Sequence, residues 1–258
     1  MKNLNIVGVI PARMASSRFP GKPLAKICDI PMIGHVYFRS KMSEMLQGVY
    51  IATCDKEIIE YAESISAKSI MTKNTHERAS DRTAEAVLKI EKETGKKIDI
   101  VVMIQGDEPL IRPETIDEAI KPLIEDTSIC VTNLMAEIKT VEEFEDPNEV
   151  KVVVDKFNNA LYFSREPIPS RKKGASCVPM LKQVCIIPFR RDFLLGYAKM
   201  EPTLLETIES VDMMRILENA IKVRMILTKH ATKAVDTHKD LKIVENLMAK
   251  DGLLKKYM

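Results

Sequence analysis

Basic side chains are concentrated in a short segment that follows the first apolar run of the chain. Residues Ile6 to Ile10 are apolar, and the segment from Pro11 to Leu24 then contains Arg13, Arg18 and Lys22. Ligands of open α/β sheets bind at the carboxyl ends of strands, where backbone N–H groups and cations can hold phosphate. The segment lacks the spacing of a P-loop. It therefore indicates a triphosphate-binding loop of another kind, the alternative being a solvated basic loop.

Two isolated acids stand in settings that suit a metal ion. Asp107 follows the apolar run from Ile98 to Ile104, and Asp236 follows Ala234 and Val235. Mg²⁺ is typically bound by one or two carboxylates together with phosphate oxygens and water. The two acids are therefore candidate Mg²⁺ ligands. The alternatives are helix-capping roles, for Asp107 near Pro113 and for Asp236 at the start of the last helix.

The sequence shows no pattern typical of a covalent nucleophile. The four histidines, His35, His76, His230 and His238, do not stand in a Ser/His/Asp or Cys/His pattern. Direct attack of a substrate oxygen on phosphorus needs no covalent intermediate, and depends on positioning and charge neutralisation. Phosphoryl-type transfer is the chemistry that these residues support best.

The elements that must position these residues alternate between strands and helices in the first half of the chain. Such alternation predicts an α/β fold with a mostly parallel, doubly wound sheet. After about Ile129 the strands are separated by shorter connections and are expected to pair antiparallel. Expected strands cover 6–10, 49–53, 98–104, 129–135, 150–154, 160–164, 184–188 and 223–227, and expected helices 33–46, 55–67, 84–94, 113–125, 191–200, 210–220 and 239–249. The segment from Pro167 to Met180 is expected to be a surface loop.

Composition limits the class of protein. A chain of 258 residues with 45% hydrophobic content can form one domain, which we expect to comprise two parts, 1–128 and 129–258. A net charge of +2 gives no general attraction to nucleic acid. The five scattered cysteines and the short apolar N-terminal run indicate reduced thiols and neither a signal peptide nor a membrane span. We expect a cytoplasmic protein without a nucleic-acid or membrane partner.

The motifs along the chain resemble those of the sugar-activating nucleotidyltransferases, and in particular the 3-deoxy-manno-octulosonate (Kdo) cytidylyltransferase family. The loop from Pro11 to Leu24 carries this resemblance first. Further blocks follow in the same order: Thr72, 79–82, 105–110, 146–151, 161–169, 190–194, 205–209 and 235–237. The resemblance implies a GT-A-like nucleotidyltransferase fold with a smaller antiparallel dimerisation layer, a homodimer, Mg²⁺ as cofactor, and transfer of CMP from CTP to an acidic sugar. It further implies that 1–128 is the CTP-binding half and 129–258 the acceptor-binding and dimerisation half.

The resemblance also implies roles for individual residues. Catalysis is expected to involve Arg13, Lys22, Asp107 and Asp236, the last two as Mg²⁺ ligands. Nucleotide binding is expected from Pro11, Ala12, Arg13, Ser17, Arg18, Lys22, Thr72, Ala79, Ser80, Arg82 and Gln105. Acceptor binding is expected from Gln105, Arg165, Gln183, Glu209 and Asp212. The arginine among these could pair bidentately with a carboxylate or phosphonate, or could form an internal salt bridge.

The chain departs from the family pattern at several positions, which leaves the acceptor open. Cys54 and Ala79 replace an acid and a glycine near the nucleotide, and Gln183, Ile187 and Met213 replace a histidine, a tyrosine and a glutamine near the acceptor. Kdo is the expected acceptor. Alternatives are 8-amino-Kdo, another ulosonate or a phosphonate in the same reaction, a GT-A glycosyltransferase, and a noncatalytic protein.

Overall fold

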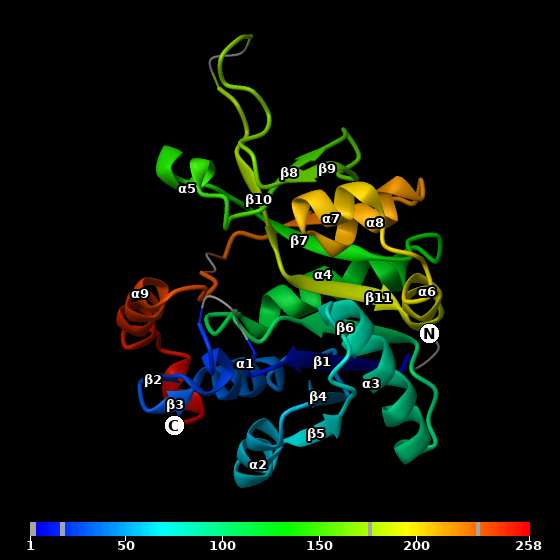
Figure 1. Ribbon diagram of the computed structural model, residues 1–258, viewed down its shortest axis with the longest axis vertical. Helices are drawn as coiled ribbons and strands as arrows, with labels where there is room; N and C mark the ends of the chain where they lie inside the picture. The colour runs from blue at the N-terminus through cyan, green and yellow to red at the C-terminus, as the bar shows by residue number, and fades with distance from the viewer. Residues whose placement is uncertain (1–3, 16–18, 175–176, 231–232) are drawn as a thin grey trace. The chain divides into compact units, whose positions relative to one another are not determined.

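The chain forms two compact units, whose elements are drawn in Figure 1. The computed structural model describes residues 4–15, 19–174, 177–230 and 233–258. Unit 1 comprises Met1–Asp117 and Thr232–Met258, and unit 2 comprises Glu118–Ala231. The C-terminal segment with Asp236 therefore belongs to the same unit as the basic loop, although it lies in the half of the sequence expected to bind the acceptor.

Parallel strands form the sheet of unit 1. These strands lie in the order β6 (Ile100–Ile104), β1 (Ile6–Ala12), β4 (Gly48–Thr53) and β5 (Lys68–Met71). Register is fixed by pairs such as Val7 with Val101 and Ile10 with Ile51. Buried β-branched residues dominate β1 and β6, as is typical of strands covered on both faces.

The strand order of unit 1 changes direction at β1. The chain runs from β1 outward to β4 and β5 and then returns to place β6 on the other side of β1. Right-handed crossovers therefore put α1 (Met32–Ser40) and α2 (Lys56–Ser64) on one face and α3 (Ala79–Thr94) on the other. In this class of sheet, ligands bind at the carboxyl ends of the strands beside such a switch point, which here are the ends of β1 and β6.

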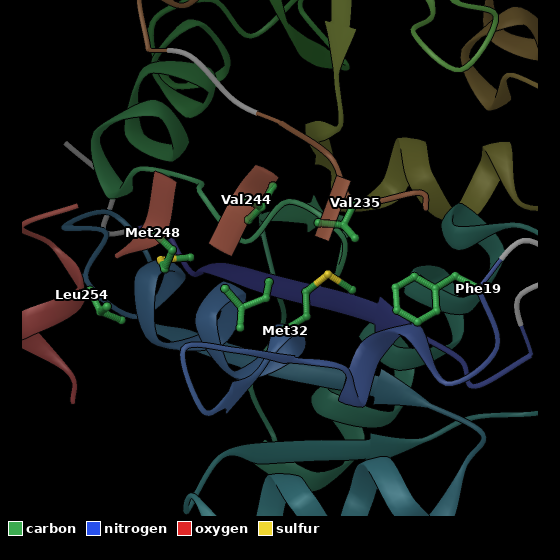
Figure 2. Packing of buried hydrophobic residues seen from close by; sticks show 7 residues of the cluster. Phe19, Met32, Val235, Val244, Met248 and Leu254 are labelled. Carbon is green, nitrogen blue, oxygen red and sulfur yellow. The ribbon is translucent and has the colours of Figure 1, made fainter. Parts of the chain in front are cut away.

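The C-terminal segment packs against the residues that follow β1. Buried apolar side chains of α9 (His238–Met248) and its flanks meet Phe19, Ile27 and Met32 (Figure 2). The residues contributed by the C-terminal segment are Val235, Val244, Met248 and Leu254. The two-residue strands β2 (Lys26–Ile27) and β3 (Ile30–Pro31) form a hairpin beside this core. This contact unites the two ends of the sequence in unit 1.

Unit 2 contains a mixed sheet. Its order is β12 (Arg224–Leu227), β7 (Thr132–Glu137), β10 (Leu181–Val184), β8 (Lys151–Val154) and β9 (Ala160–Ser164). The pairs β7–β10, β10–β8 and β8–β9 are antiparallel, whereas β12 runs parallel to β7. The two strands at the ends of this order, β9 and β12, also meet near their first residues, where Ala160 N–H donates to the Val223 carbonyl oxygen at 2.9 Å. The strand β11 (Ile186–Arg190) joins β7 through the bridge between Val131 and Phe189.

Short helices accompany this sheet. They are α5 (Val141–Glu145), α6 (Arg191–Tyr197), α7 (Leu204–Glu209) and α8 (Asp212–Glu218), and α4 (Pro113–Glu125) runs across the boundary between the units. Among the described residues, no helix has the length and apolar character needed to cross a membrane.

The expected elements are largely confirmed, with differences that bear on the site. Pro11 and Ala12 belong to β1 rather than to the loop after it, and α3 begins at Ala79, one and a half turns before the expected start. The expected strand at 184–188 is two strands, β10 and β11. Sequence periodicity also missed β5, α5 and α7, which are short and interrupted by polar residues.

A buried ion pair gives the first prediction. Arg215 Nε and Nη2 each donate to a carboxylate oxygen of Glu206 at 2.6 Å, and both side chains are almost fully buried. Arg215→Met should lower the free energy of unfolding by about 3 to 5 kcal/mol, because Glu206 is left as an uncompensated buried charge. The double variant with Glu206→Gln should recover most of the loss. Urea unfolding followed by circular dichroism measures both, and equal losses in the single and double variants would contradict this account.

The penultimate residue gives the second prediction. The Tyr257 hydroxyl accepts a hydrogen bond from Nε of Arg39, whose side chain is 0% exposed, at 2.9 Å, and it lies 2.9 Å from Nδ1 of His35. Tyr257→Phe removes this partner from two buried groups and should cost about 1 to 3 kcal/mol. Thermal unfolding should show a lower midpoint for the variant. An unchanged midpoint would mean that water replaces the hydroxyl at no cost.

Candidate active site

One lysine joins the two predicted metal ligands. Lys22 Nζ lies 2.7 Å from Asp107 Oδ2 and 3.3 Å from Asp236 Oδ1. The side chains are 14%, 22% and 20% exposed respectively, so the group is largely shielded but open to solvent. Burial opposes the charge of the lysine, but the two carboxylates outweigh it and raise the pKa of Lys22 above its ordinary value. Residues from three distant parts of the sequence thus form one charged cluster.

The backbone explains why the two acids meet. Asp107 follows β6 and Lys22 follows β1, and these adjacent parallel strands end at the same edge of the sheet. The chain then returns 128 positions later, and Val235 N–H donates to the carbonyl oxygen of Asp107 at 2.9 Å. This main-chain bond places Asp236 beside Asp107. The two acids therefore lie beside one another around Lys22, and their expected role as Mg²⁺ ligands stays a prediction.

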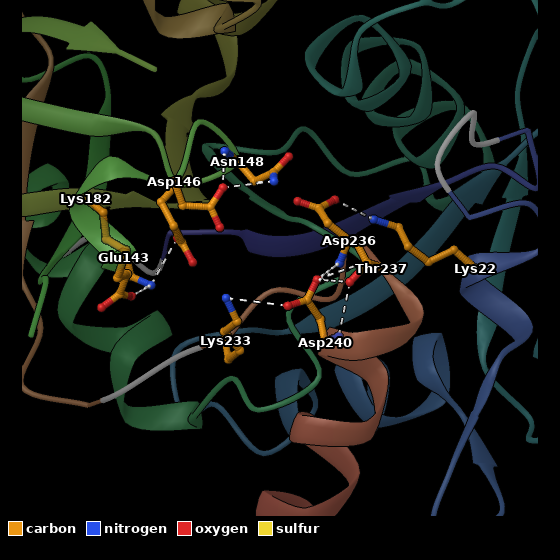
Figure 3. Close-up of polar contacts among 10 residues, drawn as sticks. Lys22, Glu143, Asp146, Asn148, Lys182, Lys233, Asp236, Thr237 and Asp240 are labelled. Carbon is orange, nitrogen blue, oxygen red and sulfur yellow. Dashed lines mark hydrogen bonds and ion pairs between the residues drawn. The ribbon is translucent and has the colours of Figure 1, made fainter. Parts of the chain in front are cut away.

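Asp236 does not cap the last helix. The N-cap of α9 is Thr237, whose hydroxyl accepts from Asp240 N–H, while the Asp240 carboxylate accepts from Thr237 N–H (Figure 3). Asp236 immediately precedes this capping box, and Figure 3 shows its carboxylate directed toward Lys22. The carboxylate is therefore available to a cation, which decides against the capping alternative. Asp107 likewise directs its carboxylate to Lys22.

The basic loop is held by its backbone. Gly21 N–H donates to the Met14 carbonyl oxygen at 3.0 Å, and Gly21 has φ = 74°, a left-handed conformation that favours glycine. Met14 N–H in turn donates to Asp55 Oδ2 at 2.7 Å. Arg13 is exposed at the end of β1, as expected of a residue that meets a polyanion. The other two predicted residues of this loop, Ser17 and Arg18, lie outside the described residues.

Asp55 is a residue of the site that the sequence analysis did not select. It follows β4, the neighbour of β1, and fixes the start of the basic loop by accepting from Met14 N–H. A signal was present in the sequence, because an acid directly after an apolar strand at this edge of a parallel sheet is well placed to hold a neighbouring loop.

The segment after β5 is organised by two side chains of α3. Arg82 Nη1 donates to the Thr72 hydroxyl and, at 3.2 Å, to the Lys73 carbonyl oxygen. Glu85 accepts from Lys73 N–H at 3.0 Å and pairs with His76. Burial alone would raise the pKa of Glu85, but hydrogen bonds from Lys89, Lys73 N–H and His76 outweigh it and lower the pKa to about 2. Two residues one helical turn apart therefore set the path of the loop that follows Thr72.

The predicted nucleotide-binding residues Ala79, Ser80 and Arg82 are helical, whereas the expected helix began only at residue 84. Ala79 begins α3 and Arg78 is its N-cap, so Ala79 has no need of the conformational freedom of glycine. Ser80 and Arg82 are buried. Arg82 thus holds the segment that contains Thr72 and Lys73.

The predicted acceptor residues of unit 2 form an internal network. The Glu209 carboxylate accepts from the Ser164 hydroxyl at 2.9 Å and from Arg165 N–H at 2.8 Å. The Arg165 guanidinium donates to the carbonyl oxygens of Glu209 at 2.7 Å and Pro147 at 2.8 Å. Among the described residues the Arg165 guanidinium forms no ion pair with a carboxylate, and its expected role in acceptor binding stays a prediction. Its guanidinium group donates to main-chain carbonyl oxygens instead.

The other predicted acceptor residues occupy separate places. Gln183 on β10 donates through Nε2 to Asn133 Oδ1 at 2.6 Å, and Asp212 begins α8, where its carbonyl oxygen accepts from the Tyr197 hydroxyl at 2.9 Å. Gln105 follows β6 in unit 1, two residues from Asp107. Of the predicted acceptor residues, only Gln105 lies in the unit that holds the charged cluster.

The residues of the cluster fit Mg²⁺. Oxygens of Asp107 and Asp236 already converge on one cation, the ammonium group of Lys22. Among the described residues, no group of three or more His, Cys, Asp or Glu side chains is placed to hold a metal by itself. A site with two carboxylates suits an ion that completes its coordination with phosphate oxygens and water.

Comparisons with known proteins agree with this arrangement. The family model described as cytidylyltransferase matches residues 7–225. The 3-deoxy-manno-octulosonate cytidylyltransferase of Geobacter metallireducens is 43% identical over 255 residues, covering 95% of this chain and 98% of the relative. The enzyme of that name from Geotalea uraniireducens is 41% identical, covering 95% and 99%.

A solved structure extends the likeness to three dimensions. The structure of CMP:2-keto-3-deoxy-manno-octonic acid synthetase complexed with CTP superposes with a TM-score of 0.87 at 38% identity, covering 95% of this chain and 99% of that one. The resemblance seen in the motifs is thereby confirmed. The chain belongs to the cytidylyltransferase family, as a member of its 3-deoxy-manno-octulosonate cytidylyltransferase group.

Proposed function

We propose that this protein transfers CMP from CTP to 3-deoxy-manno-octulosonate and releases pyrophosphate. The observation that carries the proposal is the cluster of Lys22, Asp107 and Asp236 at the switch point of the sheet. The names of the relatives supply the substrates, since proteins that are 43% and 41% identical over nearly the whole chain carry the name of this activity. The similar structure bound to CTP supports the nucleotide.

The reaction that follows from these residues is a direct displacement. A hydroxyl group of the sugar acid loses its proton to solvent and its oxygen forms a bond to the α-phosphorus of CTP, while the bond from that phosphorus to the bridging oxygen of the β-phosphate breaks and pyrophosphate leaves with the electron pair. Arg13 and Lys22, on the loop after β1, would neutralise the triphosphate. Met14 and Gly21, held by Asp55 and by each other, fix the path of that loop.

Mg²⁺ is part of the proposal. Asp107 and Asp236 would hold the ion, which when bound withdraws charge from the phosphate oxygens and orients them for displacement. The protein contributes the fixed separation of the two carboxylates through the bond between Val235 and Asp107. This division of work agrees with a reaction that depends on positioning and charge rather than on a covalent nucleophile.

Turnover tests the proposal, with pyrophosphate release as the readout. CTP with Kdo should give pyrophosphate in an acceptor-dependent manner, and UTP should be the poorer nucleotide. An 8-amino analogue and small phosphonates are the competing acceptors, because Gln183, Ile187 and Met213 depart from the family pattern. Absence of Kdo-dependent release, or faster release with another acid, would overturn the assignment of Kdo.

A matched pair of variants tests the metal site. Asp107→Asn should lower kcat/KM by roughly a hundredfold or more and weaken the dependence on Mg²⁺, because a charged ligand becomes neutral. Asp99→Asn makes the same chemical change just before the opposite end of β6 and should leave both quantities nearly unchanged. Equal behaviour of the two variants would remove Asp107 from the metal site.

We also propose that the protein is a homodimer formed through unit 2. Large apolar side chains are exposed there, with Leu204 and Ile208 of α7 at 71% and 65% and Leu161 of β9 at 61%. A chain that buries such residues against a second copy gains roughly 25 cal/mol for each Å² removed from water.

Light scattering at micromolar concentration measures the state of assembly. The mass should be about twice the 29.2 kDa of one chain, and Ile208→Glu should shift the protein toward the monomer. Val141→Glu, at another exposed apolar position of unit 2, is the control and should remain dimeric. A monomeric wild-type protein would defeat the proposal.

A further inference from the structure

The metal ligands are engaged by a side chain that the triphosphate also needs. Lys22 Nζ contacts Asp107 Oδ2 at 2.7 Å and Asp236 Oδ1 at 3.3 Å. A metal ion held by both oxygens would have to lie between them, where the ammonium group already lies. The ammonium and the metal are therefore competitors for the same pair of carboxylates.

Charge decides which cation is held in each state. Without nucleotide, one ammonium and two carboxylates leave the cluster with a net charge of about −1, and removal of the ammonium alone would leave two adjacent anions with reduced access to water. With nucleotide present, the phosphates attract the ammonium and share a metal ion with the carboxylates. Each anionic group then has a cation.

The backbone allows the exchange to involve the side chain alone. Lys22 begins a short 3₁₀ helix, where its N–H donates to the Phe19 carbonyl oxygen at 3.2 Å and its carbonyl oxygen accepts from Ala25 N–H at 3.1 Å. Lysine carries its charge on a flexible four-carbon stem. The ammonium group can therefore turn from the carboxylates to a bound phosphate while the loop keeps its path.

We propose that Lys22 is an exchangeable counter-ion, which occupies Asp107 and Asp236 in the nucleotide-free enzyme and leaves them for the triphosphate of CTP. Metal then binds to the two carboxylates only together with the nucleotide. This inference rests on the proposed function and adds an order of binding to it. It assigns Lys22 a second task besides neutralising the triphosphate, namely keeping the empty site closed to free divalent ions.

Metal binding in the absence of nucleotide tests the exchange. The probe is Mn²⁺ alone, whose free concentration is followed by electron paramagnetic resonance, and which suits the same oxygen ligands as Mg²⁺. Lys22→Met should bind Mn²⁺ at least about tenfold more tightly than wild type, equivalent to about 1.4 kcal/mol. Lys22→Arg retains the charge and should stay within about threefold of wild type.

Two further variants make the result specific. Lys26→Met removes one positive charge at an exposed position of β2, in the same segment, and should bind Mn²⁺ as wild type does. Adding Asp107→Asn to Lys22→Met should abolish the gain, which locates the new affinity at the carboxylates. If Lys22→Met does not fold, Lys22→Gln carries the same expectation, because its amide still donates to the carboxylates but has no charge.

The outcomes separate the exchange from the function. Unchanged Mn²⁺ affinity in Lys22→Met and Lys22→Gln, or an equal gain in Lys26→Met, would overturn the exchange even if wild-type protein converts CTP and Kdo to product. Failure of wild-type protein to form product would overturn the proposed function instead, whatever the Mn²⁺ titration shows.

Discussion

The ion pairs of Lys22 with Asp107 and Asp236 are the interaction on which the rest of the site depends. They require three segments to meet at one point: the loop after β1, the turn after β6 and the segment that leads into α9. Adjacent parallel strands supply the first two. The third depends on the bond from Val235 N–H to the Asp107 carbonyl oxygen and on the packing of α9 against the Phe19 and Met32 side chains. A charged cluster thus rests on an apolar core that joins the two ends of the sequence.

Hydrogen bonds also hold two further loops at the same edge of the sheet. Asp55 follows β4 and accepts a hydrogen bond from Met14 N–H. Thr72 follows β5 and its hydroxyl accepts a hydrogen bond from Arg82. A cytidylyltransferase needs little covalent chemistry from its side chains. It needs loops whose N–H groups and cations stay in place while a polyanion arrives. Acids that accept hydrogen bonds from loop N–H groups keep these loops in place, and this is as necessary as the cations that would bind phosphate.

Unit 2 illustrates how a motif residue can act through the backbone. Arg165 and Glu209 belong to motifs shared with the family, yet in this chain they bind one another's segments and the Pro147 carbonyl oxygen. Buried Lys151 adds bonds to the carbonyl oxygens of Asp146 and Glu149. These two cations order the segment 146–149 by donating to its carbonyl oxygens.

The sequence by itself determined the α/β class, three of the four parallel strands of unit 1 and the residue types of the expected phosphate and metal sites, because strand periodicity and charge after a strand are local properties. It also determined the family, through ordered motifs. Only the tertiary structure decided that Thr237 rather than Asp236 caps α9. The same holds for Arg82, which bonds to a loop from within a helix, and for Arg165, whose guanidinium donates to carbonyl oxygens. Each of these depends on which partner lies within hydrogen-bond distance. Partners far apart in sequence, such as Lys22 and Asp236, are brought together only by the fold.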